Sequence, residues 1–425
     1  MSPDEFIISF WHGPSPENDT PERFKEIADA GFNLVMPHCA FPPADKAKSI
    51  NLKILDLCAK YGLKAIILDA RIHSSKADPK AKDFSEKLAA AVSDYASHPA
   101  LYGYDVADEP GTGGFPRVAA ICQALLSKDP KHLPFVNLLP IHAVGGPPFI
   151  NDDAQFPRIA KDYDNHLEQY FKQVKPKLLS YDEYDLIESG GPIPLEGHGM
   201  LGMYFPNLEK IREKSLKYRV PFNNIILVTP HLHAFGAYRN PTFEELRFLV
   251  YTTIAYGGRG IMYFTYDSVT EFGTDAIIKR DGTKSKHYDE VSRLNREIRA
   301  LAPVLCTLHS DGVYHVGRMP KLGQSLPKDG LIKQLEGADA VVSYFSDAKG
   351  ARYLMIVNKD YAQDHSITIT FPQSVRLETI SPSNGQPEAL PHTSVGKDQS
   401  ETFALSFGPG EGKLFKVDEL KMNQP

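Results

Sequence analysis

The stretch Leu101-Tyr-Gly-Tyr-Asp-Val-Ala-Asp-Glu-Pro110 decides how the rest of the chain is interpreted. Its tyrosines and valine suit a pleated, half-buried strand, and the proline and the glycine that follows it end that strand. Asp108 and Glu109 therefore fall at the carboxyl end of a strand, side by side, where their like charges repel each other. Either a nearby cation or a cap neutralises this pair, or the pair performs chemistry.

The composition is that of a large globular protein. The 425 residues are 42% hydrophobic and 24% charged, which is enough for one large domain and a smaller one. The 47 basic and 53 acidic residues give a net charge of −6, without blocks of like charge. This balance argues against a nucleic-acid partner and favours a neutral or weakly charged ligand. The cysteines lack C-x-x-C spacing, so neither a zinc site nor a disulfide framework is predicted; they are Cys39, Cys58, Cys122 and Cys306.

The hydropathy of the sequence predicts no membrane span. Runs of eighteen apolar residues do not occur, and the first residues lack the basic and apolar regions of an export signal. The first predicted strand begins within a few residues of Met1, so a signal removed ahead of it is compatible with the sequence. We therefore favour a secreted or periplasmic location over a cytoplasmic one.

Hydrophobic runs alternate with helical patterns as far as residue 303. Eight such repeats predict an α/β fold, a (β/α)8 TIM barrel over residues 1–303. A doubly wound sheet is the alternative, but its G-x-G-x-x-G turn does not follow the first strand. The predicted strands are Phe6–Trp11, Phe32–His38, Leu63–Ala70, Leu101–Pro110, Phe135–Pro140, Leu178–Leu186, Ile225–His231 and Gly260–Asp267. The first helix begins at Thr20, and the others lie near residues 52–61, 83–95, 115–127, 166–174, 208–218, 244–255 and 288–301.

Two polar stretches interrupt this alternation. We expect a long loop over His142–Tyr163, and we expect Gly145–Tyr163 and Glu188–Leu201 to build the substrate cleft.

Beyond residue 303 the hydrophobic period changes to two. Short strands with Gly, Asp or Asn turns predict a C-terminal antiparallel β-sandwich domain over residues 304–425. This domain carries no obvious acid pair, so a structural role is favoured over carbohydrate binding. The expected strands are Gly312–Val316, Gly330–Leu335, Ala340–Phe345, Tyr353–Asn358, Ser366–Phe371, Val375–Ile380, Phe403–Phe407 and Gly412–Val417.

In a barrel, the carboxyl ends of all strands converge on one mouth. The residues at these ends are rich in acids, imidazoles and aromatic rings, which suit a sugar or another polyol. We expect substrate binding by Trp11, His38, Asp69, Asn137, Tyr181, Glu183, His231 and Tyr266, and the same ends also carry His12, Arg71, Asp108, Glu109, Asp182, His233 and Asp267.

Several of these residues have a second interpretation. His231 and His233 could bind a metal with Asp267, but hydrogen bonding to substrate or to an acid is favoured, so we predict no catalytic metal and no cofactor. Trp11 suits the core as well as sugar stacking. Asp69 and Arg71 suit an internal ion pair as well as a binding role.

The segment Tyr104–Pro110 resembles the strand-four acid/base motif of the (β/α)8 glycoside hydrolase superfamily, of the clan-A type. The resemblance implies that Glu109 protonates the glycosidic oxygen, a step that needs a carboxylic acid with a raised pKa. The chain departs from the usual pattern in two places: Asp108 replaces an asparagine, and residues 228–233 at the end of strand seven contain no nucleophilic carboxylate.

The adjacent Asp108 and Glu109 are also similar to the pair of β-N-acetylhexosaminidase-type barrels. That resemblance implies that Asp108 orients a substrate acetamido group acting as nucleophile, with Tyr181 and Asp182 assisting from strand six. Asp182 or Glu183 could instead activate water in an inverting mechanism, or act as a displaced nucleophile. In a regular strand, either Tyr181 and Glu183 or Asp182 and Tyr184 share a face.

The sequence thus predicts a glycoside hydrolase of oligo- or polysaccharides, with catalytic Glu109, Asp108 and Asp182 and a carbohydrate substrate as partner. The alternative is a non-catalytic glycan-binding barrel that has lost its strand-seven nucleophile. A third possibility is a metal-dependent barrel enzyme that uses His38, His231 and His233.

Overall fold

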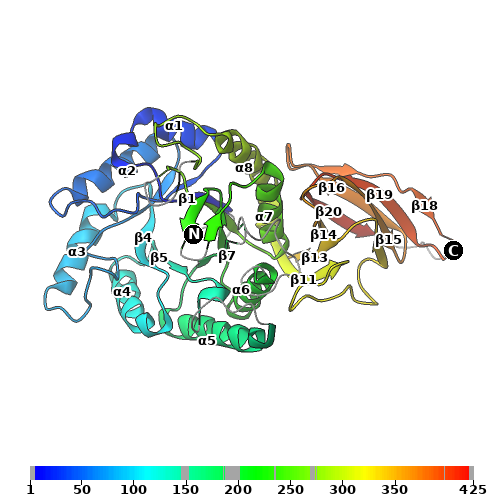
Figure 1. Cartoon of the computed structure of the whole chain (residues 1–425), viewed down its shortest axis with the longest axis horizontal. Coiled ribbons are helices and arrows are strands. Elements are labelled where there is room, and N and C mark those ends of the chain that lie inside the picture. The colour runs from blue at the N-terminus through cyan, green and yellow to red at the C-terminus, as the bar shows by residue number, and fades with distance from the viewer. Residues whose placement is uncertain are drawn as a thin grey trace. The chain divides into compact units, whose positions relative to one another are not determined.

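The computed structural model describes residues 5–144, 153–184, 186, 202–233, 236–268, 273, 275–396 and 398–420. The chain forms two compact units (Figure 1). The main segments of the first are Ile7–Pro241 and Gly260–Asn295, and those of the second are Thr242–Arg259 and Arg296–Pro425. The second unit thus takes in a segment from the middle of the chain, and the boundary after residue 303 stays a prediction. In the described ranges, no helix is both long and apolar enough to cross a membrane.

The first unit is built on a nearly closed parallel sheet of eight strands, as the sequence predicted. The strands follow the order β1-β10-β7-β6-β5-β4-β3-β2. Asn33 joins the two ends of the sheet, because its N–H donates to the carbonyl of Ile8 at 3.0 Å and its Oδ1 accepts from the Ile8 N–H at 2.8 Å. The strands are β1 (Ile7–Trp11), β2 (Leu34–Val35), β3 (Lys64–Ile67), β4 (Leu101–Asp108), β5 (Leu133–Leu138), β6 (Leu179–Asp182), β7 (Phe222–Leu227) and β10 (Gly260–Phe264).

Helices follow the strands, and in Figure 1 helices α1 to α6 surround the barrel strands of their unit. Local signals fix several of them: Thr20 caps α1 by accepting from the N–H of Arg23, and Thr242 and Glu245 form a capping box on α7. The helices are α1 (Pro21–Asp29), α2 (Ala47–Lys60), α3 (Phe84–Tyr95), α4 (Phe115–Lys128), α5 (Phe156–Val174), α6 (Tyr204–Tyr218), α7 (Phe243–Ala255) and α8 (Lys286–Leu305).

Two sequence-based expectations were wrong here. The predicted loop over His142–Tyr163 ends early, because α5 begins at Phe156 with Pro157 in its first turn and buries an apolar face. Strand β7 ends at Leu227, and His231 belongs to a separate hairpin of β8 (His231–His233) and β9 (Gly236–Tyr238). Pro230 lies between them and lacks the N–H that a continuous ladder needs. Most of the two cleft-forming stretches, residues 145–152 and 187–201, lies outside the described residues.

The second unit is an antiparallel β-sandwich, also as predicted, with a core of aliphatic and phenylalanine side chains. Within this unit, α7 packs against β13, β14 and β20. One sheet has the order β11-β13-β14-β20-β16-β17 and the other β12-β15-β19-β18. The strands are β11 (Leu308–Val316), β12 (Gln334–Glu336), β13 (Ala340–Asp347), β14 (Arg352–Asn358), β15 (His365–Phe371), β16 (Val375–Ile380), β17 (Pro387–Ala389), β18 (Ser394–Val395), β19 (Glu401–Phe407) and β20 (Gly412–Glu419); the sequence did not predict the short β17 and β18.

Candidate active site

A β-bulge near the end of β4 aligns two acids on one face of the strand. Asp105 pairs with Phe135 of β5 and Asp108 pairs with Asn137, although two residues lie between the acids and only one lies between their partners. The register shift between residues 105 and 107 supplies the extra residue. Asp105 and Asp108 therefore line the same cavity, which a regular strand would not allow.

Glu109 leaves β4 in an unusual backbone conformation. Its φ is 45°, and its N–H donates to the carbonyl of Asn137 at 2.9 Å. A non-glycine residue at positive φ is uncommon and is found mostly where the surrounding structure holds it. Its carboxyl group lies close enough to that of Asp182, at the end of β6, for each acid to influence the pKa of the other. The carboxyl ends of β4 and β6 thus bring two acids near each other.

Asn137 of β5 bridges the acids of the two flanking strands. Its Nδ2 donates to Asp182 Oδ1 at 2.8 Å and to Asp108 Oδ1 at 3.2 Å. Its Oδ1 accepts from Ser180 Oγ at 3.1 Å, and Ser180 Oγ in turn accepts from Asn223 Nδ2 at 3.1 Å. Because the carbonyl side of the amide is occupied by Ser180, the NH2 side is fixed toward the two carboxyl groups.

The pKa values of Asp108, Glu109 and Asp182 are raised, chiefly because partial or full burial of a carboxyl group disfavours its charged form. Burial, followed by the charge of Glu109, raises the pKa of Asp108 to about 7. Burial also raises the pKa of Glu109 and, together with the charges of Glu109 and Asp108, that of Asp182. Asp108 and Glu109 remain open to solvent at the mouth, whereas Asp182 is buried. In the described part of the chain, these acids form no ion pair with lysine or arginine, and Asp108, with a pKa of about 7, is partly protonated at neutral pH.

His142 and Glu183 form a second pair beside the acids. His142 Nδ1 and Glu183 Oε1 lie 2.9 Å apart, and Glu183 is buried. The positive potential of His142 opposes the rise in the pKa of Glu109. Glu183 follows Asp182 directly in the chain and contacts the imidazole of His142. That imidazole in turn affects the pKa of Glu109.

A cavity of about 150 Å³ opens next to Asp108. Trp11 stands at the end of β1 with its ring centre 5.9 Å from that of Phe135, and His12 lies between the rings of Trp11 and Phe264. The cavity is lined by Trp11, His12, Met36, Pro37, His38, Cys39, Phe41, Leu68, His73, Asp105 and Asp108. Two expected substrate-binding residues, Trp11 and His38, are thus brought together with Asp108.

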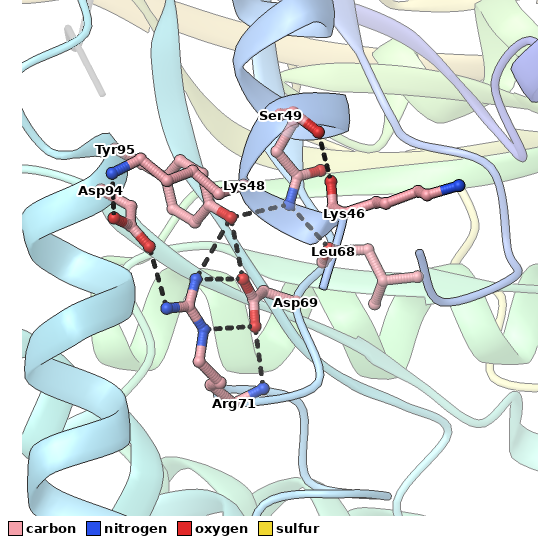
Figure 2. Close-up of polar contacts among 9 residues, drawn as sticks. Lys46, Lys48, Ser49, Leu68, Asp69, Arg71, Asp94 and Tyr95 are labelled. Carbon is pink, nitrogen blue, oxygen red and sulfur yellow. Dashed lines mark hydrogen bonds and ion pairs between the residues drawn. The ribbon is translucent and has the colours of Figure 1, made fainter. Parts of the chain in front are cut away.

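Asp69 is not part of this group and forms an ion pair, as Figure 2 shows. Arg71 Nη2 lies 2.7 Å from Asp69 Oδ2 and Arg71 Nε lies 3.0 Å from Oδ1, while the hydroxyl of Tyr95 donates to Oδ2 at 2.9 Å. Arg71 also contacts Asp94, which pairs with Lys48. Of the two interpretations of Asp69, the structure supports the internal ion pair.

Tyr181 and Tyr266, both expected to bind substrate, point away from the acids. Tyr181 is fully buried beside Tyr163, Tyr204 and Asn207 of the surrounding helices. Tyr266 is fully buried, with its ring centre 4.5 Å from that of Phe10. The alternation of side chains along β6 explains the orientation of Tyr181, because the side chain of Asp182 lies on the inner face of the strand and that of Tyr181 on the outer face.

His231 lies at the mouth but not in a metal-binding group. Its Nδ1 is 2.9 Å from the carbonyl oxygen of Thr229, and its ring centre is 5.3 Å from that of Phe264. Asp267 instead accepts from the N–H of Ser15 at 2.8 Å and from Asn18 Nδ2 at 3.0 Å. The side chain of His233 lies outside the description. Among the side chains that are described, no group of three or more His, Cys, Asp or Glu could hold a metal ion.

Sequence reasoning did not select four residues that the structure places here, namely Asp105, His73, His142 and Tyr184. The ring of Tyr184 lies 5.2 Å from Phe264 and 6.4 Å from His231, and the charges of Asp182 and Glu109 help to raise its pKa after burial. The alternation of β6 predicted that Tyr184 shares a face with Asp182. No sequence signal indicated the bulge that turns Asp105 inward.

Comparisons with known proteins connect this site to a fold. Neither a protein-family model nor a curated protein sequence matches the chain. A solved structure described as a glycoside hydrolase is 13% identical and covers 97% of this chain and 92% of its own, with a TM-score of 0.57. A glycoside hydrolase family 5 protein from Bacteroides vulgatus is 12% identical, with coverages of 99% and 92% and a TM-score of 0.58. A GH27 β-L-arabinopyranosidase from Geobacillus stearothermophilus is 11% identical, with coverages of 100% and 98% and a TM-score of 0.53. The expected resemblance to (β/α)8 glycoside hydrolases is thereby confirmed as a likeness of fold.

Proposed function

We propose that this protein is a glycoside hydrolase in which Glu109 is the general acid. The observation that carries the proposal is the group of acids at the barrel mouth, in which Asn137 bridges Asp108 and Asp182 beside Glu109 and burial raises the pKa of all three acids. A barrel binds its substrates at this end. The likeness of fold to solved glycoside hydrolases supports the same reaction class.

The chemistry follows from where the protons are held. A sugar oxygen leaves poorly as an alkoxide, so a carboxylic acid that is still protonated near neutral pH must supply a proton. Glu109 is open to solvent at the mouth and can reach a substrate, whereas the buried Asp182 stands behind it. In this proposal, Asp182 keeps a proton on the pair and Asn137 fixes the position of Asp182.

Asp108 is the assisting carboxyl in this proposal. It lines the cavity, whereas β7 and the residues 228–233 that follow it contain no carboxylate. Inverting enzymes keep their two carboxyl groups roughly 6.5–9.5 Å apart to admit a water molecule. The close approach of Glu109 and Asp182 does not leave that space between them, which argues against Asp182 as the base of an inverting mechanism. Asp108 then attacks the sugar directly or orients its 2-acetamido group.

The test compares wild type with Glu109→Gln on aryl glycosides of hexoses, pentoses and N-acetylhexosamines and on natural glycans. We expect the wild type to hydrolyse at least one substrate and the variant to lose about 10²–10⁴-fold in kcat/KM. The matched control is Glu86→Gln, an exposed glutamate on α3, which should keep the full rate. A requirement for the 2-acetamido group would identify the substrate-assisted route.

Two outcomes would contradict the proposal. Equal turnover by wild type and Glu109→Gln on natural glycans and on glycosides of weakly acidic phenols would remove Glu109 from the chemistry. Glycan binding without turnover by the wild type would instead favour the non-catalytic glycan-binding barrel.

A further inference from the structure

Asp105 is a buried acid for which the fold provides no partner. Its side chain is 6% exposed, and in the described part of the chain its Oδ1 has no hydrogen-bond partner. Burying an unpartnered carboxyl group costs free energy unless a ligand completes its hydrogen bonds. The bulge in β4 points this group into the cavity beside Asp108. Asp105 lies in the lining of this cavity, and its carboxyl group is a hydrogen-bond acceptor that a ligand there would meet.

The imidazoles of the cavity supply a complementary set of donors. His38 Nδ1 accepts from the N–H of Ala40 at 3.1 Å, and His73 Nδ1 accepts from the N–H of Ser75 at 3.2 Å. Each ring accepts through Nδ1, which leaves Nε2 as the nitrogen that can donate to a ligand. His12 is neutral, because burial lowers its pKa to about 3.

Among the described residues, those that line this cavity provide no lysine or arginine to balance an anion. They include two carboxyl groups. Lys76 is exposed and lies over the ring of Phe41, with its ammonium group 5.5 Å from the ring centre, and it is not one of the lining residues. A sugar carboxylate or sulfate would therefore enter beside Asp105 and Asp108 without a counter-charge, which is unfavourable in a partly buried site.

On the basis of the proposed glycosidase function, we propose that this cavity binds an uncharged sugar ring and that Asp105 is its specificity-determining residue. Asp105 accepts or shares a hydrogen bond with a ring hydroxyl, the imidazole Nε2–H groups donate to neighbouring hydroxyls, and Trp11 supplies an apolar face. The arrangement admits neutral hexoses, pentoses and N-acetylhexosamines and rejects uronic acids and sulfated sugars.

The proposal is tested by isothermal titration of the full-length protein with free monosaccharides, which requires no turnover. The ligands are glucose, galactose, mannose, fucose, xylose, arabinose, N-acetylglucosamine, N-acetylgalactosamine, glucuronate and galacturonate. We expect at least one neutral sugar to bind and Asp105→Ala to weaken that binding by tenfold or more. The matched control is Asp364→Ala, an exposed aspartate of the second unit, which should bind like the wild type.

A second variant separates binding from a structural role. Asp105→Asn keeps the shape of the side chain and removes an ionisable group that lacks a partner, so its thermal midpoint should equal or exceed that of the wild type while sugar binding weakens. The proposal is overturned if no neutral sugar binds the wild type, if the uronates bind best, if Asp105→Ala binds like the wild type, or if Asp105→Asn loses thermal stability. Binding that persists in a protein without turnover would refute the proposed hydrolase activity alone.

Discussion

Two groups of acids lie at strand ends of the same barrel, and they differ in whether a cation pairs with them. After β3, the buried Asp69 accepts hydrogen bonds from Nε and Nη2 of Arg71 and from the hydroxyl of Tyr95. At the ends of β4 and β6, burial and the charge of Glu109 raise the pKa of Asp182, and no lysine or arginine within the described ranges pairs with either acid. The first arrangement balances a buried charge, whereas the second raises the pKa of its acids.

The presence or absence of a paired cation distinguishes an acid with a structural role from the acids that we propose to be catalytic. This distinction uses no comparison with other proteins. A fold can neutralise a buried carboxylate with a guanidinium, as it does for Asp69, and such a pair is costly to break. Where no cation pairs with a buried carboxyl group, the pKa of that group rises, and it becomes able to donate a proton near neutral pH. Stability and chemistry should therefore respond oppositely to substitutions in the two groups.

Arg71→Met should produce the largest effect, and it should act on stability. The substitution leaves Asp69 buried without its cation, at a cost of about 3–5 kcal/mol. Urea unfolding followed by the fluorescence of Trp11, the only tryptophan, reports on the barrel. The activity of the folded protein should be unchanged. Lys87→Met, which removes an exposed pair with Asp83, is the control and should leave the unfolding curve unchanged.

Asp182→Asn should have the opposite profile. The amide cannot share a proton with Glu109, so kcat/KM should fall by about 10²-fold or more. The thermal midpoint at pH 8 should equal or exceed that of the wild type, because a buried acid without a counter-charge has been removed. A loss of stability comparable to that of Arg71→Met, with activity retained, would show that the two groups of acids are alike.

Asn137→Ala tests the bridge between the acids. Hydrogen bonds to ionisable groups contribute about 1.5–3 kcal/mol, so losing both should lower kcat/KM by roughly 10- to 100-fold. The KM should change less than kcat, since the amide contacts Asp108 and Asp182, the acids proposed to act in catalysis, and does not line the cavity. Steady-state kinetics on the best substrate decides, and an effect confined to KM would argue for a substrate-binding role instead.

The pH dependence of stability gives a smaller effect of defined sign. The pKa of Asp108 is about 7 in the folded protein, above its ordinary value, so the folded state binds more protons than the unfolded state between about pH 4 and 7. Its contribution to stability is present below this window and is lost as the pH rises through 7. The urea midpoint of the wild type should therefore fall more between pH 5 and pH 8 than that of Asp108→Asn. Parallel changes would contradict the raised pKa.

Tyr184→Phe and Tyr181→Phe give the smallest expected difference and test the orientation of β6. Removing the hydroxyl of Tyr184, on the inner face with Asp182, should lower kcat/KM by roughly threefold to tenfold. Tyr181→Phe should alter the melting temperature and leave kcat/KM intact, because Tyr181 is fully buried on the outer face. The reverse result would show that the strand presents its other face.

Hydrophobic patterning was sufficient to predict the barrel and the sandwich, because each strand is a short apolar run bounded by turn residues. It also located Asp108, Glu109, Asn137 and Asp182, since strand ends converge whatever the loops do. It did not predict that Asp105 faces inward, because a bulge reverses the alternation without leaving a signal in the sequence. Nor did it decide the partner of Asp69, since an ion pair and a binding site require the same residue types.

The most direct measurement of the central claim compares wild type with Glu109→Gln on aryl glycosides whose phenol pKa values span about 4 to 10. If Glu109 protonates the leaving oxygen, the wild type should depend weakly on phenol pKa. The variant should be nearly as fast on the most acidic phenols and at least about 10²-fold slower on the least acidic ones. A ratio of wild-type to variant kcat/KM that stays constant across the series would contradict the account, because Glu109 would then act on something other than the departing oxygen.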